Sequence, residues 1–372
     1  MLITSPTKTF GLDISDLSLK AVQLKRVKNI NYIQAINSIR VQPGLIIEGV
    51  IQDQKKIAQL IKKLIEKSPN KFTSSYAVVS LPEPKTFIKV IQISKSAAQK
   101  NKIRDLIKEE LPRHVPINIE EIQIDWQEVE NNNKYRKFLV GAVPTTIVNA
   151  LVETCKIARI NITALEVEAQ AIERCIISQK QFKATEVSWV GKIFKHQDKN
   201  KTNLEENKCP KIVLDLGATR TSIILIDKGI IQFANSIDNI SGEKLTKRIA
   251  KEKNLKYEEA EKAKLICGTD PKKCKGETLN IITESINDLA KEIINANTFY
   301  QDHFGKDTNN IEIVLCGGGA NLSGIDKILK EKLKRKVTIA DPTININGAG
   351  IKQLGNIHSY TTAIGLALRN YL

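Results

Sequence analysis

The stretch "FGLDISDLSLK", residues 10–20, is a short apolar run that ends in Asp13 and continues through a small polar turn into a second strand-like run. The same order returns as "KIVLDLGATRTSIILID", residues 211–227, where Asp215 takes the corresponding place. In both copies a third strand-like segment follows. One pattern of strand, turn and strand that occurs twice indicates an α/β chain with a repeated architecture.

An acid at the end of a strand, in front of a tight turn, has two ordinary uses. It can bond to the backbone of its own turn, which is the commoner case for a single copy. Alternatively, the N–H groups of the turn hold phosphate oxygens while the carboxylate holds a metal ion or its water. Two such hairpins facing each other would enclose the phosphate tail of a nucleotide, so the repeat favours the second use for Asp13 and Asp215.

A third element supports this interpretation. The segment "IEIVLCGGGANLSGI", residues 311–325, is an apolar strand followed by three glycines, Gly317 to Gly319, and by a helix expected to start near Ser323. Glycines allow a close approach of the backbone, and a helix N-terminus attracts anions. Together with the two hairpins, in this order, the loop indicates a nucleotide-binding cleft.

Composition bounds the remaining possibilities. The 372 residues, 41% of them hydrophobic, can fill two or more lobes. No apolar run reaches the roughly 18 residues that a membrane span needs, and no signal peptide is evident, so we expect a cytoplasmic protein. The six cysteines and four histidines show no zinc or disulfide spacing, and we expect the cysteines to be reduced thiols.

The net charge of +16 favours anionic partners, either nucleic acid or the acidic inner face of a membrane. Many of the lysines lie on the polar faces of predicted helices, where they simply interact with solvent. Aromatic residues make up only 5% of the chain and leave few platforms for stacking bases, so we expect no nucleic-acid partner.

Apolar periodicity predicts helices at residues 53–67, 96–110 and 145–160, and a further helix that runs to about residue 178. Residues 194–210 are polar, charged and without periodicity, which indicates a linker between two lobes.

The order of hairpin, connecting helix, second hairpin and glycine loop resembles the superfamily of actin, heat-shock chaperone and sugar-kinase ATPases. Within it, "FGLDISDLSLKAVQL", "EELPRHVPINIEEIQIDW", "LEVEAQAIER" and "YTTAIGLALRNYL" are similar to the FtsA and PilM branch, and to the PilM family of type IV pilus assembly proteins in particular. The resemblance implies a two-lobed actin-like ATPase fold with a duplicated RNase H-like core. It places the first lobe at residues 1–205, with an inserted α+β subdomain at about 40–145, and the second at 206–372, with a helical insert at about 240–308.

The resemblance also implies a site for ATP and Mg²⁺. Asp13 and Asp215 would hold the metal, and Glu168, with Glu166 as the second choice, would position a hydrolytic water. The residues implied to contact the nucleotide are Ser15, Asp16 and Lys20 in the first hairpin, Gly217, Ala218 and Thr219 in the second, Glu243 and Lys247 near the ribose and adenine, and Gly317, Gly318, Gly319 and Asn321 beside the adenosine.

Simpler explanations exist for some of these residues. Glu168 could be a solvated acid at a helix start, and Glu243 with Lys247 could be an i,i+4 ion pair. The first hairpin also departs from the family pattern, because Ser15 stands where glycine is usual and Asp16 adds negative charge. A strained turn and charge repulsion would make nucleotide binding weak or hydrolysis very slow.

In function, the resemblance implies a cytoplasmic component of the inner-membrane platform of a type IV pilus or a related secretion system. Its partner would be the N-terminal cytoplasmic tail of a bitopic, PilN-like membrane protein, bound beside the inserted subdomain. Self-association through that subdomain is the alternative for the insert. Two alternatives for the whole chain are an FtsA-like cell-division anchor, which expects an amphipathic membrane helix after the core, and a small-molecule kinase, which expects acids and amides for a sugar.

Overall fold

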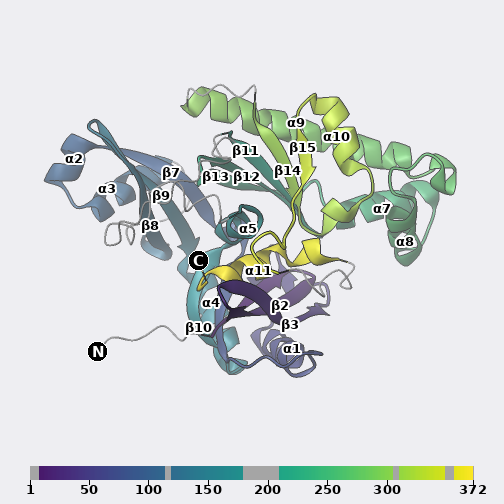
Figure 1. The fold of residues 1–372 in the computed structure, drawn as a ribbon, viewed down its shortest axis with the longest axis horizontal. Coiled ribbons are helices and arrows are strands. Elements are labelled where there is room, and N and C mark those ends of the chain that lie inside the picture. Colours follow the sequence, from purple (N-terminus) through teal and green to yellow (C-terminus); the bar gives the residue numbers. More distant parts are fainter. Residues whose placement is uncertain (1–7, 114–118, 179–208, 305–309, 348–355, 372) are drawn as a thin grey trace.

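The structure is a computed structural model that describes residues 8–113, 119–178, 209–304, 310–347 and 356–371. Figure 1 shows two lobes, one above the other, with α5 (Glu168–Ile176) and α11 (Thr361–Leu368) between them. The predicted linker at residues 194–210 lies largely outside the described residues. Of the helices in these ranges, none is long and apolar enough to cross a membrane.

The first lobe is built on a five-stranded sheet with the order β10-β6-β1-β2-β3. Its first three strands form an antiparallel meander, and β6 and β10 run parallel to β1. The central strand, β1, is buried along nearly its whole length, as expected for a strand covered on both faces. The strands are β1 (Phe10–Ser15), β2 (Ser18–Val27), β3 (Ile30–Arg40), β6 (Tyr76–Leu81) and β10 (Asn161–Val167).

The second lobe repeats this arrangement. Its strands have the order β15-β14-β11-β12-β13, with an antiparallel meander of three and two parallel strands beside β11. Asp13 and Asp215 lie near the ends of the equivalent strands β1 and β11, which confirms the predicted duplication. The strands are β11 (Lys211–Leu216), β12 (Thr221–Asp227), β13 (Ile230–Ile237), β14 (Glu312–Cys316) and β15 (Val337–Ile339).

The inserted subdomain extends the second sheet. Its antiparallel strands are β7 (Phe87–Ser94), β9 (Tyr135–Pro144) and β8 (Ile122–Asn131), and β7 pairs with β13 through Lys89 and Phe233, which gives an eight-stranded sheet. The single helix predicted at 96–110 is two helices, α2 (Lys95–Lys100) and α3 (Ile103–Glu110). Asn101 between them has an extended backbone, consistent with its poor helix propensity.

The predicted start of the insert, at residue 40, is too early. The short hairpin of β4 (Ile46–Ile47) and β5 (Val50–Ile51) is followed by α1 (Gln54–Glu66), which Asp53 caps by accepting a hydrogen bond from the N–H of Lys56. Helix α1 packs into the core of the first lobe, and β6 lies in the middle of its sheet. Strands β7 and β9 also contribute to this core, through Ile88, Val90, Leu139 and Val143, whereas α2 and α3 pack in a separate cluster on the same strands.

The remaining helices cover the sheets. In the first lobe, α4 (Thr145–Ile157) packs beside α1. In the second, α9 (Leu279–Phe304) packs on the sheet through residues such as Ile282, Leu289 and Ile293, and α10 (Ile325–Leu333) lies beside it. Of the predicted helical insert at 240–308, therefore, only α7 (Gly242–Lys253) and α8 (Tyr257–Cys267) form an outer layer, as Figure 1 shows.

One expectation about the cysteines is wrong. Cys267, at the end of α8, forms a disulfide with Cys274 in the following turn. A spacing of seven residues carries no disulfide signal in the sequence, but the left-handed backbone of Cys274 and Lys275 folds the turn back toward α8. The other described cysteines, Cys155, Cys175, Cys209 and Cys316, are free.

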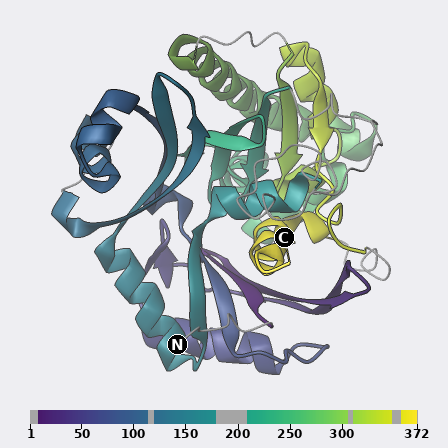
Figure 2. The ribbon, with the colours of Figure 1, turned by 60° about the vertical axis from the view of Figure 1, so that its left-hand side comes forward.

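Helix α11 lies between β1 and α5, and Figure 2 shows it directly beside α5. The approach is close enough to require glycine on both sides. A Cβ on Gly365 would lie 1.8 Å from the backbone oxygen of Ala171 in α5, and a Cβ on Gly11 would lie 2.2 Å from that of Ala363 in α11. These contacts hold the C-terminal helix under the cleft that separates the lobes.

We predict that Gly365→Ala lowers the free energy of unfolding by about 1–3 kcal/mol, the usual cost of overpacking a core. A glycine-to-alanine change inside a helix ordinarily stabilises by roughly 1 kcal/mol, so the backbone clash would reverse the sign. Gly141→Ala is the matched control, because its Cβ would approach nothing closer than the Asp125 oxygen at 4.0 Å. Urea denaturation measures both; a Gly365→Ala variant as stable as wild type contradicts the proposed contact.

Candidate functional site

A cavity of about 710 Å³ lies between the two lobes. Both hairpins, the start of α5, the glycine loop and the helices α7 and α8 contribute to its wall. Most of the predicted site residues line it: Asp13, Ser15, Asp16, Lys20, Glu168, Asp215, Gly217, Ala218, Thr219, Glu243, Gly317, Gly318 and Gly319. The sequence therefore predicted the main walls of this cleft.

Two of the residues implied to contact the nucleotide do not line the cleft. Lys247 is largely exposed and forms an ion pair with Glu243 at 2.6 Å, as the simpler i,i+4 explanation expects. Asn321 donates to the carbonyl oxygen of Gly318 and to Oδ1 of Asn356, so it fixes the glycine loop from outside. Of the pair Glu243 and Lys247, therefore, only Glu243 lines the cavity.

Asp13 lies at the end of β1 and is almost fully buried. Its carboxylate accepts hydrogen bonds from Ser15 Oγ at 3.1 Å and Ser80 Oγ at 3.4 Å, and it pairs with Lys20 Nζ at 3.3 Å. Lys20, which the resemblance assigns to phosphate, is thus directed at Asp13 and also donates to Ser18 Oγ.

Asp215, the equivalent acid of the second lobe, is half-buried. Desolvation and then the negative charge of Asp13 raise its pKa to about 6, against the opposing effect of Arg220 and Lys20. The glycine loop touches it directly, since a Cβ on Gly317 would lie 2.1 Å from Asp215 Oδ1. Gly317 also has φ = +77°, so both space and backbone geometry require glycine there.

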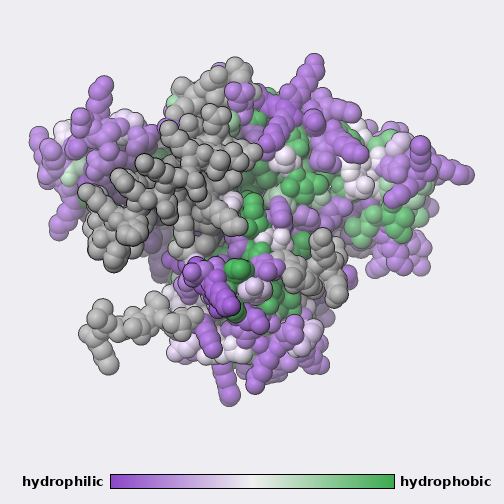
Figure 3. Space-filling model, viewed as in Figure 1, coloured by the Kyte–Doolittle hydropathy of each residue, from purple (hydrophilic) through white to green (hydrophobic). Residues whose placement is uncertain are grey.

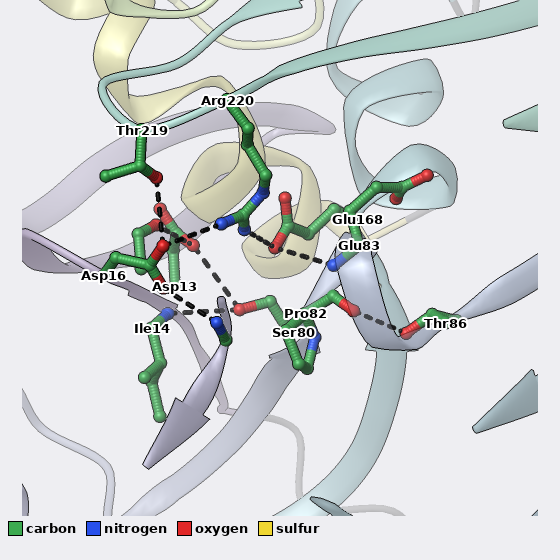
Figure 4. Close-up of polar contacts among 12 residues, drawn as sticks. Asp13, Ile14, Asp16, Ser80, Pro82, Glu83, Thr86, Glu168, Thr219 and Arg220 are labelled. Atoms are coloured by element: carbon green, nitrogen blue, oxygen red, sulfur yellow. Dashed lines mark hydrogen bonds and ion pairs between the residues drawn. The ribbon is translucent and has the colours of Figure 1, made fainter. Parts of the chain in front are cut away.

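Arg220 was not predicted, yet it connects both lobes. It follows Thr219 in the second hairpin and is only 8% exposed. Its Nη1 lies 3.4 Å from Asp16 Oδ2 in the first hairpin, and its Nη2 lies 3.1 Å from Glu168 Oε1 at the start of α5 (Figure 4). The sequence signal was a lone basic residue in an otherwise small and uncharged turn, "GATRTS".

Asp16 is a paired carboxylate and not an isolated negative charge. Besides pairing with Arg220, it accepts hydrogen bonds from the Gly49 N–H at 2.8 Å and from Thr219 Oγ1 at 3.0 Å. Ser15 does not have positive φ, in contrast to several other described residues, so the turn is not strained there. Arg220 therefore partly offsets the negative charge that Asp16 adds to this hairpin.

Glu168 is 5% exposed and begins α5. It accepts from Arg220 and, at 3.4 Å, from the N–H of Glu83, and burial raises its pKa to about 7 while Arg220 opposes that rise. A solvated helix-start acid is therefore the wrong description. Glu166, the second choice for water positioning, pairs with Arg174 and Arg369 and lines a different cavity.

Glu83 also escaped the sequence analysis. The residue is 3% exposed, and within the described part of the chain neither carboxyl oxygen has a hydrogen-bond partner. Burial, and next the charge of Glu168, raise the pKa of Glu83 to about 8. At neutral pH this side chain is mainly protonated. Nothing in the segment "LPEP" signals this, because the charged groups that act on Glu83, among them Glu168 and Arg220, are distant in the sequence.

One wall of the cleft is apolar. Tyr257 and Leu265 on α8 and Ile282 on α9 line it, and both α8 residues remain well exposed. Figure 3 shows apolar surface in the hollow between the lobes and over α8. The cleft thus has an apolar end on the helical layer and a charged end where the hairpins meet.

A second cavity, of about 580 Å³, lies between the inserted subdomain and the first lobe. Strands β8 and β9 form one side, and β10 with α5 forms the other. Its wall includes apolar residues, among them Ile88, Leu139 and Val143, while Glu166, Arg174 and Arg369 contribute charge.

Comparison with known proteins identifies the family. The family model described as type IV pilus assembly protein PilM matches residues 11–371. Among solved structures, one titled PilM-PilN type IV pilus biogenesis complex has a TM-score of 0.76 at 22% identity over 98% of both chains. The ethanolamine utilization protein EutJ from Carboxydothermus hydrogenoformans has a TM-score of 0.55 at 16% identity, over 98% of this chain and 90% of that one.

MreB5 of Spiroplasma citri bound to ADP has a TM-score of 0.54 at 14% identity, over 96% of this chain and 98% of that one. These similarities confirm the two-lobed actin-like ATPase fold. Because the family model spans nearly the whole sequence, the chain belongs to the PilM family of type IV pilus assembly proteins.

Proposed function

We propose that this chain is a nucleotide-binding component of the inner-membrane assembly platform of a type IV pilus or related secretion system, and that it docks the cytoplasmic tail of a membrane partner. The observation that carries the nucleotide part is the pairing of two equivalent hairpins, with Asp13 and Asp215, around one cavity that also contains the Gly317 to Gly319 loop. The family match favours this role over an FtsA-like anchor or a small-molecule kinase.

The cleft offers each part of a nucleotide a suitable wall. The base and ribose would lie toward Tyr257 and Leu265, beside the glycine loop, where apolar and backbone surface is available. The phosphates would then point to the hairpins, whose turns supply N–H and hydroxyl donors. A protein of the same fold, MreB5 of Spiroplasma citri, is described as bound to ADP, which supports nucleotide binding by this chain.

Asp13 and Asp215 fit a magnesium ion as part of its ligand set. Carboxylate oxygens are the ligands that Mg²⁺ prefers, and the ion ordinarily keeps waters and phosphate oxygens as well. Among the residues that the structure describes, no group of three or more His, Cys, Asp and Glu could hold a metal. The two aspartates would therefore bind the ion together with the nucleotide, and the ion would offset the excess of acids around them.

Hydrolysis by this cleft would be slow or absent. Glu168 is the one predicted water-positioning acid that lines it, and Arg220 and the Glu83 N–H already occupy one of its oxygens. With a pKa near 7, the carboxyl group is also partly protonated at neutral pH and so a poor proton acceptor. This supports a scaffold whose nucleotide stabilises the closed lobes.

The second cavity fits the tail of a membrane partner. An extended segment could lay apolar side chains against Leu139 and Val143 while its polar groups meet Arg174 and Arg369. The solved PilM-PilN complex shows that a protein of this fold assembles with PilN, and a PilN-like tail would bring this chain to the inner face of the membrane. The net charge of +16 would add attraction to anionic lipid.

The nucleotide proposal predicts a ligand-dependent change in thermal stability. Saturating Mg-ATP or Mg-ADP should raise the melting temperature of the full chain, because a ligand at 100 times its Kd stabilises the folded state by about 2.7 kcal/mol. Asp215→Ala should abolish the rise, whereas Asp302→Ala, on the exposed surface of α9, should keep it. Differential scanning calorimetry measures the shift, and an unchanged rise in Asp215→Ala removes this hairpin from the phosphate site.

The docking proposal predicts that filling the second cavity blocks the tail. Gly141→Phe places a ring in the cavity without a backbone clash, since the nearest atom to its Cβ is 4.0 Å away. Affinity for a synthetic peptide of the PilN-like protein's cytoplasmic N-terminus, measured by fluorescence anisotropy, should fall at least tenfold. Gln92→Phe, an exposed position on β7 outside the cavity, is the control.

Unchanged peptide affinity in Gly141→Phe contradicts the docking site. If sedimentation velocity instead shows that the wild-type chain is an oligomer and that Gly141→Phe dissociates it, the inserted subdomain serves self-association.

The buried Glu83, which lies next to Glu168, predicts a fall in stability as pH rises. Glu83 keeps its proton in the folded state up to about pH 8 but loses it near 4.5 when unfolded, so the folded form binds more protons across this interval and becomes relatively less stable with increasing pH. Glu83→Gln should therefore stabilise the protein at pH 8 by on the order of a few kcal/mol, and hardly at pH 4.5. Urea denaturation at both values tests this, with exposed Glu331→Gln as control; equal effects at the two pH values would argue against a protonated Glu83.

A further inference from the structure

The carboxylate of Asp16 occupies the junction between the two hairpins (Figure 4). It is 10% exposed, and three donors satisfy it: the Gly49 N–H at 2.8 Å, Thr219 Oγ1 at 3.0 Å and Arg220 Nη1 at 3.4 Å. Two of these donors belong to the second lobe. A negatively charged group of the protein itself therefore joins the lobes at the charged end of the cleft.

The donors that Asp16 uses are those that an anionic ligand would need. A turn hydroxyl and a guanidinium group are typical partners of phosphate oxygens. Thr219 gives its hydroxyl hydrogen to Asp16, and Arg220 divides its guanidinium between Asp16 and Glu168. An anion arriving at this junction would have to displace a carboxylate, whereas Lys20, the other cation of the hairpins, pairs with Asp13.

The shape of the cleft decides which part of a nucleotide meets Asp16. Tyr257 and Leu265 line the apolar end on α8, and Asp16 and Arg220 line the charged end, where the two hairpins meet. With its base at the apolar end, a nucleotide would extend its phosphates toward the hairpins. The phosphate at the end of the chain would then come nearest to the junction of Asp16 with Arg220.

We propose that the Asp16 carboxylate takes the place of the terminal phosphate, so that the cleft selects a nucleoside diphosphate over a triphosphate. This inference rests on the proposed nucleotide-binding function and deepens it. A diphosphate leaves the contacts of Asp16 with Thr219 and Arg220 intact. A triphosphate breaks them and brings its added negative charge against Asp16 in a site that is poorly screened by water.

The test compares Mg-ADP and Mg-ATP by isothermal titration calorimetry on the full chain. Wild type should bind Mg-ADP at least tenfold more tightly than Mg-ATP. Asp16→Ser, which frees Thr219 and Arg220, should tighten Mg-ATP at least tenfold and change Mg-ADP less than threefold. Asp302→Ser, an exposed aspartate on α9, should leave both affinities as in wild type.

Asp16→Asn keeps the shape of the side chain without its charge, and it serves if Asp16→Ser does not give a cooperative thermal transition. Equal wild-type affinities for the two nucleotides, or a ratio that the folded Asp16 variant leaves unchanged, overturn the inference while the nucleotide function stands. If an Asp16 variant binds Mg-ATP and wild type does not, the result supports both the inference and the nucleotide function. Failure of every folded variant to bind either nucleotide overturns both.

Discussion

The contacts of Arg220 are the constraint on which the cleft depends. Five acids, Asp13, Asp16, Glu83, Glu168 and Asp215, lie around the hairpins, and within the described residues of this region Lys20 and Arg220 are the cations that oppose them. Carboxylates gathered in a desolvated site repel one another and favour protonation. The raised pKa values of Glu83, Glu168 and Asp215 express this cost. Because Arg220 touches both Asp16 and Glu168, one guanidinium offsets the charge and fastens the second lobe to the first.

The duplicated core explains why the acids gather there. In each lobe the first strand of the meander has a parallel neighbour on its other side: β6 runs parallel to β1, and β14 runs parallel to β11. The turns that follow β1 and β11 therefore open at the same edge of their sheets. When the two lobes face each other, both edges meet the same cleft. Two glycines allow these elements to approach closely: Gly365 lets α11 pack against α5, and Gly317 lets its loop contact Asp215. The site follows from backbone packing at a few positions that tolerate no side chain.

The site residues that lie in a recurring local pattern could be predicted from the sequence. Asp13, Asp215 and Gly317 could be found because each lies in a local pattern of strand, turn and glycine whose spacing is visible in the chain. Arg220 and Glu83 could not be assigned a role, because their importance comes from partners 204 and 85 residues away, Asp16 and Glu168. The predicted insert at about 40–145 included β6, which lies in the sheet of the first lobe. A parallel strand gives no local sign in the sequence of the strand beside which it lies. The disulfide of Cys267 likewise depends on a turn that spacing does not reveal.

The two cavities share one element. Strand β10 leads into α5, and this short path borders both cavities: Glu166 lines the cavity beside the inserted subdomain, and Glu168 lines the cleft between the lobes. Further along α5, Arg174 pairs with Glu166 and also donates to the carbonyl oxygen of Gly365 in α11. A ligand that draws Arg220 from Glu168 and a peptide that contacts Glu166 or Arg174 would act on the same helix from opposite sides. Since α5 packs closely on α11 through Gly365, it has little freedom to adjust to one of them independently of the other.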